Sequence, residues 1–184
     1  FAQGAEAAAE ELGIDSIDLK YHYTGNFDAT PETQTLATSW YAEGIEVIFA
    51  AGGLVGNSVM SAAEAAGAAV IGVDVDQSPE SETVITSAMK GLGATVNTLL
   101  GAIQEGKWDE YAGQIKTLGL VSETPADNYV QLPDSTQWAD GFQQADYEQL
   151  VKELFNGERT VSADTEKIPA VKNIKVDDQG AIKG

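Results

Sequence analysis

Residues 45–74 have the sequence IEVIFAAGGLVGNSVMSAAEAAGAAVIGVD, which contains one complete strand–helix–strand unit. The apolar runs at 45–50 and 69–74 are short and rich in Ile and Val, which is typical of buried parallel strands. Between them, a glycine-rich turn leads into an alanine-rich helix over 58–66 that ends at Gly67. This pattern predicts two parallel strands joined by a helical crossover.

The residues that precede this unit repeat the same alternation. A helix rich in Ala and Glu is predicted over 2–12, and a strand over 17–23 follows it. A Thr-Pro pair at 30–31 then begins a second helix that runs to about Ala42, with Thr as the N-cap and Pro in the first turn. Residues 2–74 therefore alternate helix and strand three times, which predicts an α/β fold with a parallel sheet covered by helices.

Beyond residue 74 the alternation is less regular. In chain order, the sequence predicts a strand from Val84 to near Lys90, a helix over 94–103, strand-like pieces over 114–132, a helix over 146–155 and a final edge strand over 171–176.

Composition excludes several classes of function. The chain has 10 basic and 29 acidic residues and a net charge of −19, so its surface repels nucleic acid. It has no Cys and a single His, which disfavours zinc sites and catalysis by Cys or His, and we predict no metal ion, cofactor or catalytic residue.

The sequence given shows neither a signal peptide nor a lipid-anchor Cys near residue 1, and we expect it to be part of a longer protein.

Three loops are predicted to follow the carboxyl ends of the strands, where ligands bind in parallel sheets. They contain Phe27, Gly52 with Gly53, and Asp74. A loop aromatic such as Phe27 stacks on flat ligands, but it can equally fold back onto its own helix. The two glycines allow a ligand to approach the backbone, or they simply make a tight turn. Asp74 can accept hydrogen bonds from a vicinal diol, or it can be an ordinary residue at the start of a loop.

Two further features allow a functional and a structural interpretation. Lys90 follows a predicted strand and, taken alone, reads as a surface lysine. The Asp-x-Asp pattern at 74–76 resembles the signature of haloacid dehalogenase phosphatases, but those enzymes place it on their first strand, whereas here it follows the third. The glycine turn at 51–57 lacks the Gly-Lys-Ser/Thr of a phosphate-binding loop. We therefore predict neither a phosphatase of that class nor a phosphate-binding loop.

The blocks YTGNFD (23–28), IFAAGG (48–53), VIGVDVDQ (70–77) and ITSAMK (85–90) occur in this order along the chain. Together they resemble the basic membrane lipoprotein (BMP) family, which includes the purine-nucleoside receptors of ABC importers. The resemblance implies a type I periplasmic-binding-protein-like fold, in which two lobes, each a parallel sheet with helices on both faces, close over a ligand. It also implies that most of the first lobe is not part of this sequence.

For the site, the resemblance implies a nucleoside of the purine type as ligand. It implies that Phe27 stacks on the base, that Asp74 holds the ribose hydroxyls, that Gly52 and Gly53 line the pocket, and that Lys90 contributes to the sugar side. It implies a binding protein rather than an enzyme, located outside the cytoplasm, with the permease subunits of an ABC transporter as partners. Contact with the membrane is then through an N-terminal lipid anchor that is absent from this chain.

The chain departs from the family pattern at two places. Gly93 stands where relatives commonly have an Asp, and 54–56 reads Leu-Val-Gly where many have Thr and Gly. For the domains, we expect 1–90 to form the second lobe and 91–120 to cross back to the first lobe. The remaining elements, over 121–184, are expected to lie partly in the second lobe.

Other functions stay open from the sequence. A receptor of the same fold for a sugar or a furanosyl signal is the nearest alternative. A regulatory ligand sensor is another. A phosphatase or a nucleoside hydrolase requires a metal and a cluster of carboxylates, which the sequence does not predict.

Overall fold

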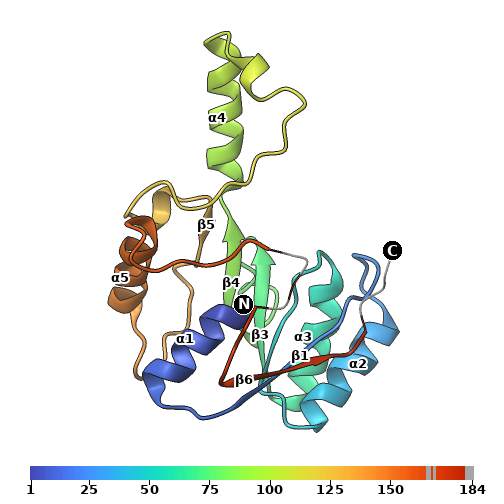
Figure 1. The fold of residues 1–184 in the computed structure, drawn as a ribbon. Helices are drawn as coiled ribbons and strands as arrows, with labels where there is room; N and C mark the ends of the chain where they lie inside the picture. Colours follow the sequence, from blue (N-terminus) through green and yellow to red (C-terminus); the bar gives the residue numbers. More distant parts are fainter. Residues whose placement is uncertain (165–166, 168, 181–184) are drawn as a thin grey trace. The chain divides into compact units, whose positions relative to one another are not determined.

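The computed structural model describes residues 1–164, 167 and 169–180 and divides the chain into two compact units. Unit 1 consists of Phe1–Gly25 and Arg159–Gly184, and unit 2 is the continuous segment Asn26–Glu158. The predicted α/β class is confirmed, because helices alternate with parallel strands along the first half of the chain (Figure 1). The assignment of 1–90, 91–120 and 121–184 to lobes stays a prediction, and residues 165, 166, 168 and 181–184 of the third segment lie outside the described part.

Unit 1 joins the two ends of the chain. Helix α1 (Ala2–Leu12) has its predicted bounds and ends at Gly13, which adopts the left-handed conformation with φ 66°. Strand β1 (Ile17–Tyr21) pairs in parallel with β6 (Ile174–Asp178). The predicted edge strand near the end of the chain is therefore confirmed, and it gives β1 a partner in a separate two-stranded sheet.

Unit 2 contains a four-stranded sheet with the order β2-β3-β4-β5. Strands β2 (Val47–Phe49), β3 (Ala69–Asp74) and β4 (Val84–Lys90) are parallel, and the short β5 (Val130–Gln131) is antiparallel to β4. Because parallel neighbours end at the same edge of a sheet, the loops after β2 and β3 emerge side by side.

Two helices cover this sheet and form the hydrophobic core with it. The predicted N-cap of α2 (Pro31–Ala42) is confirmed, since Thr30 Oγ1 accepts a hydrogen bond from the N–H of Thr33 at 3.2 Å. Helix α3 (Val55–Ala66) begins three residues earlier than predicted. The core residues come from both helices and the strands: Ala37, Trp40, Tyr41, Ile48, Ala50, Val55, Val59, Met60, Ala62, Ala63, Val70 and Val84.

The second half of unit 2 is less regular. Helices α4 (Leu92–Gln104) and α5 (Gln144–Phe155) are each longer than predicted. The prediction of strand-like pieces over 114–132 is wrong except for β5, because that segment consists mainly of irregular chain and bends, with the 3-10 helix η2 (Pro125–Asp127) inside it. A second 3-10 helix, η1 (Trp108–Glu110), follows α4. Within unit 2, Figure 1 shows α4 continuing past the end of β4, away from the sheet.

Within the part of the chain that the structure describes, no helix combines the length and apolar character that crossing a membrane requires.

Tyr41 makes a pH-dependent contribution to the stability of unit 2. Its hydroxyl donates to the C=O of Ala69 at 2.9 Å, and burial raises its pKa to about 12. In an unfolded chain the pKa of Tyr is about 10. The contribution is therefore complete below pH 10 and is lost as the pH rises from 10 to 12.

We expect Tyr41→Phe to lower stability by about 1 kcal/mol at neutral pH and to reduce the further loss between pH 10 and 12. Urea unfolding at a series of pH values measures both effects, and equal pH slopes for the two proteins would contradict the assignment.

Candidate functional site

Asp74 ends β3 in an unusual backbone conformation. Its φ is 71°, and no other non-glycine residue of the described chain has a positive φ. The N–H of Val75 donates to the C=O of Val73 at 2.8 Å, so Asp74 is the central residue of a γ-turn of the rare, strained form. Such a conformation costs about 1–3 kcal/mol and persists where the surrounding structure enforces it. Strain at the carboxyl end of a parallel strand marks Asp74 as a candidate functional residue.

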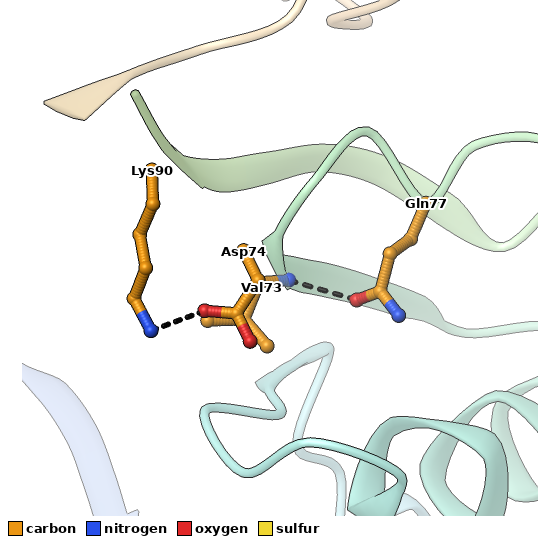
Figure 2. A network of polar contacts seen from close by, with 4 residues as sticks. All are labelled: Val73, Asp74, Gln77 and Lys90. Carbon is orange, nitrogen blue, oxygen red and sulfur yellow. Dashed lines mark hydrogen bonds and ion pairs between the residues drawn. The ribbon is translucent and has the colours of Figure 1, made fainter. Parts of the chain in front are cut away.

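The carboxylate of Asp74 forms an ion pair with Lys90. Asp74 lies opposite Met89 in the β3–β4 ladder, so Lys90 is the next residue along β4. The Lys90 Nζ is 2.5 Å from Asp74 Oδ1 (Figure 2). The Lys90 side chain is 62% exposed and the Asp74 side chain 39%, so this pair contributes little to stability. Oδ1 is itself buried and has no hydrogen-bond partner besides this ion pair. One carboxylate oxygen is thus shielded, and the side chain keeps an exposed surface for a hydrogen-bond donor.

A second pair is formed by Phe27 and the glycine turn after β2. The N–H of Leu54 donates to the C=O of Phe27 at 2.9 Å. Gly53 has φ 56°, and a Cβ placed on it would lie 3.3 Å from both the Cβ and the carbonyl oxygen of Phe27. A Cβ on Gly52 would lie 3.3 Å from Val55 Cγ2. The turn therefore needs glycine to bring the backbone of Phe27 close, while the Phe27 residue stays 73% exposed.

The structure thus brings the predicted residues together as two pairs, one beside the end of β2 and the other at the ends of β3 and β4. Phe27 contacts the turn that follows β2, and the Asp74–Lys90 pair lies at the ends of β3 and β4. Among the described residues, no hydrogen bond or ion pair joins one pair directly to the other. The groups that these two pairs leave open to a ligand are the exposed ring of Phe27 and the partly exposed carboxylate of Asp74.

Gln77 is a residue that the sequence interpretation missed. Its side chain is buried, and its Oε1 accepts a hydrogen bond from the N–H of Val73 at 2.8 Å (Figure 2). Its own N–H donates to Ser87 Oγ at 3.1 Å. A Cβ on Gly72 would lie 2.6 Å from Ser87 Oγ and 2.8 Å from Gln77 Oε1. The only signal in the sequence is the position of Gln77 in the block around Asp74, and this does not reveal that its amide turns back into the fold.

Asp76 has a structural role in the same loop. Its Oδ1 accepts hydrogen bonds from the N–H of Ser78 at 3.0 Å and from the hydroxyl of Ser135 at 2.9 Å. Partial burial tends to raise the pKa of Asp76, but these hydrogen bonds outweigh it and lower the pKa below its usual range. Asp74 and Asp76 therefore have different partners, Lys90 for the first and two serines for the second.

Asn128 organises the loop beside the end of β4, and the sequence did not indicate it. It is fully buried, and its side chain makes four hydrogen bonds to backbone groups of 121–124. The N–H of Gly91 donates to the C=O of Tyr129 at 2.8 Å, and a Cβ on Gly91 would lie 2.9 Å from the carbonyl oxygen of Asn128. This ordered loop therefore packs directly against the residue that follows Lys90.

The chemistry of the arrangement suits a neutral, flat ligand that carries hydroxyl groups. Asp74 offers acceptors for hydroxyl donors, Lys90 limits the net charge of the site, and Phe27 offers an apolar ring. Among the described residues, no group of three or more His, Asp or Glu side chains is placed to hold a metal ion.

Comparison with known families identifies a match over most of the chain. The family described as "ABC transporter substrate-binding protein PnrA-like" (Bmp) matches residues 1–158.

Individual relatives carry related names. The chain is 36% identical over 100 residues to "Basic membrane protein A2" of Borrelia garinii subsp. bavariensis, covering 53% of this chain and 29% of that protein. It is 30% identical over 141 residues to "Basic membrane protein B" of Borreliella burgdorferi, covering 75% and 40%. It is 29% identical over 138 residues to "ABC transporter nucleoside-binding protein BmpA" of Lactococcus lactis subsp. cremoris, covering 65% and 38%. The chain therefore spans less than half the length of these relatives.

A solved structure shares the fold. The crystal structure of a transcriptional activator of the comK gene from Bacillus halodurans aligns with a TM-score of 0.54 at 19% identity. The alignment covers 75% of this chain and 46% of that chain. At this identity the likeness concerns the fold alone.

Proposed function

The chain belongs to the family of PnrA-like ABC transporter substrate-binding proteins, and on this basis we propose that it forms part of a receptor that captures a nucleoside for an ABC importer. The family is one of substrate-binding proteins rather than enzymes. The observation that supports the nucleoside is an exposed aromatic ring, held on a glycine turn, at the same sheet edge as a partly exposed carboxylate. The name of the nucleoside-binding relative from Lactococcus lactis agrees with it.

Each predicted site residue has a role in this proposal. The ring of Phe27 stacks on the base, and Gly52 and Gly53 let the ligand approach the backbone. The carboxylate of Asp74 accepts hydrogen bonds from the two ribose hydroxyls, and Lys90 donates on the sugar side. The purine preference rests on the family resemblance, and residues outside this chain would read the base.

A sugar is the competing ligand within the same class. A pyranose can also stack on Phe27 and donate hydroxyls to Asp74. A nucleoside is favoured because 73% of Phe27 is exposed beside Gly52 and Gly53, whose lack of side chains leaves room for a flat base. Competition separates the two: free ribose or galactose should not displace a bound nucleoside at equal concentration.

The proposal includes a location and partners. The receptor lies outside the cytoplasm, is held at the membrane by an N-terminal lipid anchor that is not in this chain, and delivers its ligand to permease subunits. The family description and the name of the Lactococcus lactis relative, both of which refer to ABC transporters, support this part of the proposal.

Helix α4 supports the proposed return of residues 91–120 to a first lobe. The helix contains no charged residue, and among its described residues only Ala102 is buried. Four apolar side chains on it are more than half exposed: Leu92, Val96, Leu100 and Ile103. An apolar surface of this kind is typical of a helix that packs against another part of a protein. We therefore propose that α4 packs on the first lobe of a two-lobed protein that includes this chain.

Calorimetry of the full-length protein with guanosine, inosine, adenosine and uridine tests the function. We propose that at least one purine nucleoside binds with micromolar affinity or better, and that the 184-residue chain alone binds poorly, because ligands in two-lobed receptors are buried by closure. Chromatography of the same mixtures with magnesium should show unchanged nucleosides. Release of free base in proportion to protein would overturn the proposal.

Phe27→Ala in the full-length protein should weaken nucleoside binding by roughly 5- to 150-fold, since base stacking on an aromatic ring is worth about 1–3 kcal/mol. Thermal stability should hardly change, because the side chain is exposed. Phe27→Trp keeps a stacking surface and should retain most of the affinity. Calorimetry measures the affinities, and full affinity in Phe27→Ala would remove the ring from the site.

A further inference from the structure

We propose that Gln77 is a positioning residue, whose buried side chain enforces the strained turn at Asp74 and so places the carboxylate for its ligand. This inference rests on the proposed function for the identity of the ligand. The positioning itself rests on geometry alone. Gln77 lies three residues beyond Asp74, and its amide oxygen returns to the residue that precedes Asp74 (Figure 2).

Both backbone polar groups of Val73 are engaged in the loop. Its C=O accepts the N–H of Val75 at 2.8 Å, which closes the γ-turn. Its N–H donates to Gln77 Oε1 at 2.8 Å. The two peptide groups that flank Val73 are thereby fixed in orientation, and the second of them closes the turn around Asp74, which has little freedom to return to an extended φ.

Gln77 is itself held in place. Its N–H donates to Ser87 Oγ across the β3–β4 pair at 3.1 Å, and its Nε2 lies 3.3 Å from Glu80 Oε1. Gly72 provides the necessary space, because any Cβ there would lie 2.8 Å from Gln77 Oε1. The Gln77 residue is only 7% exposed, so water cannot readily replace the N–H of Val73 as the hydrogen-bond partner of its amide oxygen.

Strain explains why such support is needed. A non-glycine residue with positive φ relaxes unless neighbouring contacts enforce the conformation. Lys90 approaches Asp74 from the other side, but its exposed ion pair is too weak to provide that support. We infer that without the amide oxygen of Gln77 the turn opens and the Asp74 carboxylate leaves its binding position.

The test uses Gln77→Met in the full-length protein, which keeps the volume of the side chain and removes the acceptor. Nucleoside affinity should fall about tenfold. A 2′,3′-dideoxynucleoside, which has no diol, should bind the variant as it binds the wild type. In the Asp74→Ala background, Gln77→Met should cause no further loss. Additive losses, or equal losses for both ligands, would overturn the positioning role.

Gln131→Met is the matched control. Gln131 bonds backbone groups too, but as a donor: its Nε2 donates to the carbonyls of Ala126 at 2.8 Å and Asn128 at 2.6 Å, and it lies on β5. This variant should lower the melting temperature without weakening nucleoside binding. If Gln131→Met weakens binding as much as Gln77→Met does, the effect is general loss of structure and the inference is wrong.

A measurement without ligand separates this inference from the proposed function. Asp74→Gly and Asp74→Ala both lose the carboxylate, but only glycine accepts positive φ without strain. With Gln77 present, Asp74→Gly should melt roughly 2–4 °C above Asp74→Ala. With Gln77→Met the difference should vanish, because the turn has already opened. An unchanged difference would overturn the positioning role even if nucleosides bind as proposed. If the difference disappears in the Gln77→Met background, the positioning role is supported even if nucleosides do not bind as proposed.

Discussion

Asp74→Ala is expected to weaken nucleoside binding to the full-length protein by roughly a hundredfold or more. In the proposed complex the Asp74 carboxylate accepts hydrogen bonds from two ribose hydroxyls, and each charge-assisted bond is worth about 1.5–3 kcal/mol. The variant leaves both hydroxyls without a partner in a closed cleft. The effect should exceed that of Lys90→Ala, because Lys90 is a flexible, 62% exposed cation beside a neutral ligand. Calorimetry of both variants with one purine nucleoside shows which substitution weakens binding more.

The 2′,3′-dideoxynucleoside supplies the control for this experiment. It should bind the wild type about as weakly as the natural nucleoside binds Asp74→Ala, and the substitution should hardly weaken it further. Asp74→Asn tests charge separately from shape, since Asn tolerates positive φ and keeps one acceptor oxygen. If Asp74→Ala binds the natural nucleoside with full affinity and remains folded, Asp74 has no role in recognition.

Asn128→Ala is expected to produce the largest loss of stability among the substitutions considered. The fully buried side chain accepts hydrogen bonds from the N–H groups of Val121 at 2.6 Å and Ser122 at 2.9 Å, and it donates to the carbonyls of Ser122 and Thr124, each at 3.0 Å. Removing it leaves four backbone groups without partners. At about 1 kcal/mol for each bond, the loss is about 4 kcal/mol, which corresponds to a fall in melting temperature of roughly 8–16 °C.

Circular dichroism during heating measures this fall, with Asn57→Ala as the matched control. Asn57 is exposed on α3, where Ala is the better helix former, so the control should melt at or slightly above the wild type. A fall of less than about 2 °C in Asn128→Ala would show that water replaces the lost side chain and that the loop tolerates its absence.

The elements that the sequence predicted well are those with local signals. Gly13 in the left-handed conformation ends α1, and Thr30 caps α2, because both effects act within a few residues. The bounds of β3 were predicted because its apolar run is short and ends at Asp74. The loops with Phe27 and the glycine turn were predicted at one edge of a sheet; the hydrogen bond from Leu54 N–H to the C=O of Phe27 joins them, although β1 lies in a separate two-stranded sheet.

The features that were missed depend on partners far along the chain or on side-chain geometry. The segment 114–132 contains apolar residues without a period, and within it the amide of Asn128 rather than a strand ladder satisfies backbone groups of 121–124. Gln77 is buried only because Gly72 lacks a Cβ and Ser87 faces it from β4. The ion pair of Asp74 with Lys90 follows from the register of two strands, which the sequence did not specify.

The pairing of β1 with β6 has a consequence for the order of folding. Ile17 pairs with Ile174, so unit 1 closes only between the two ends of the chain, whereas unit 2 is continuous in sequence. Contacts of such high sequence separation form late, because the entropy of closing a long loop must be overcome first. During synthesis on the ribosome, β1 therefore waits for β6 to emerge, while unit 2, which precedes β6, has already been able to fold. Until then, β1 lacks the strand with which it pairs in the folded chain, and an unpaired strand edge favours mispairing with other chains.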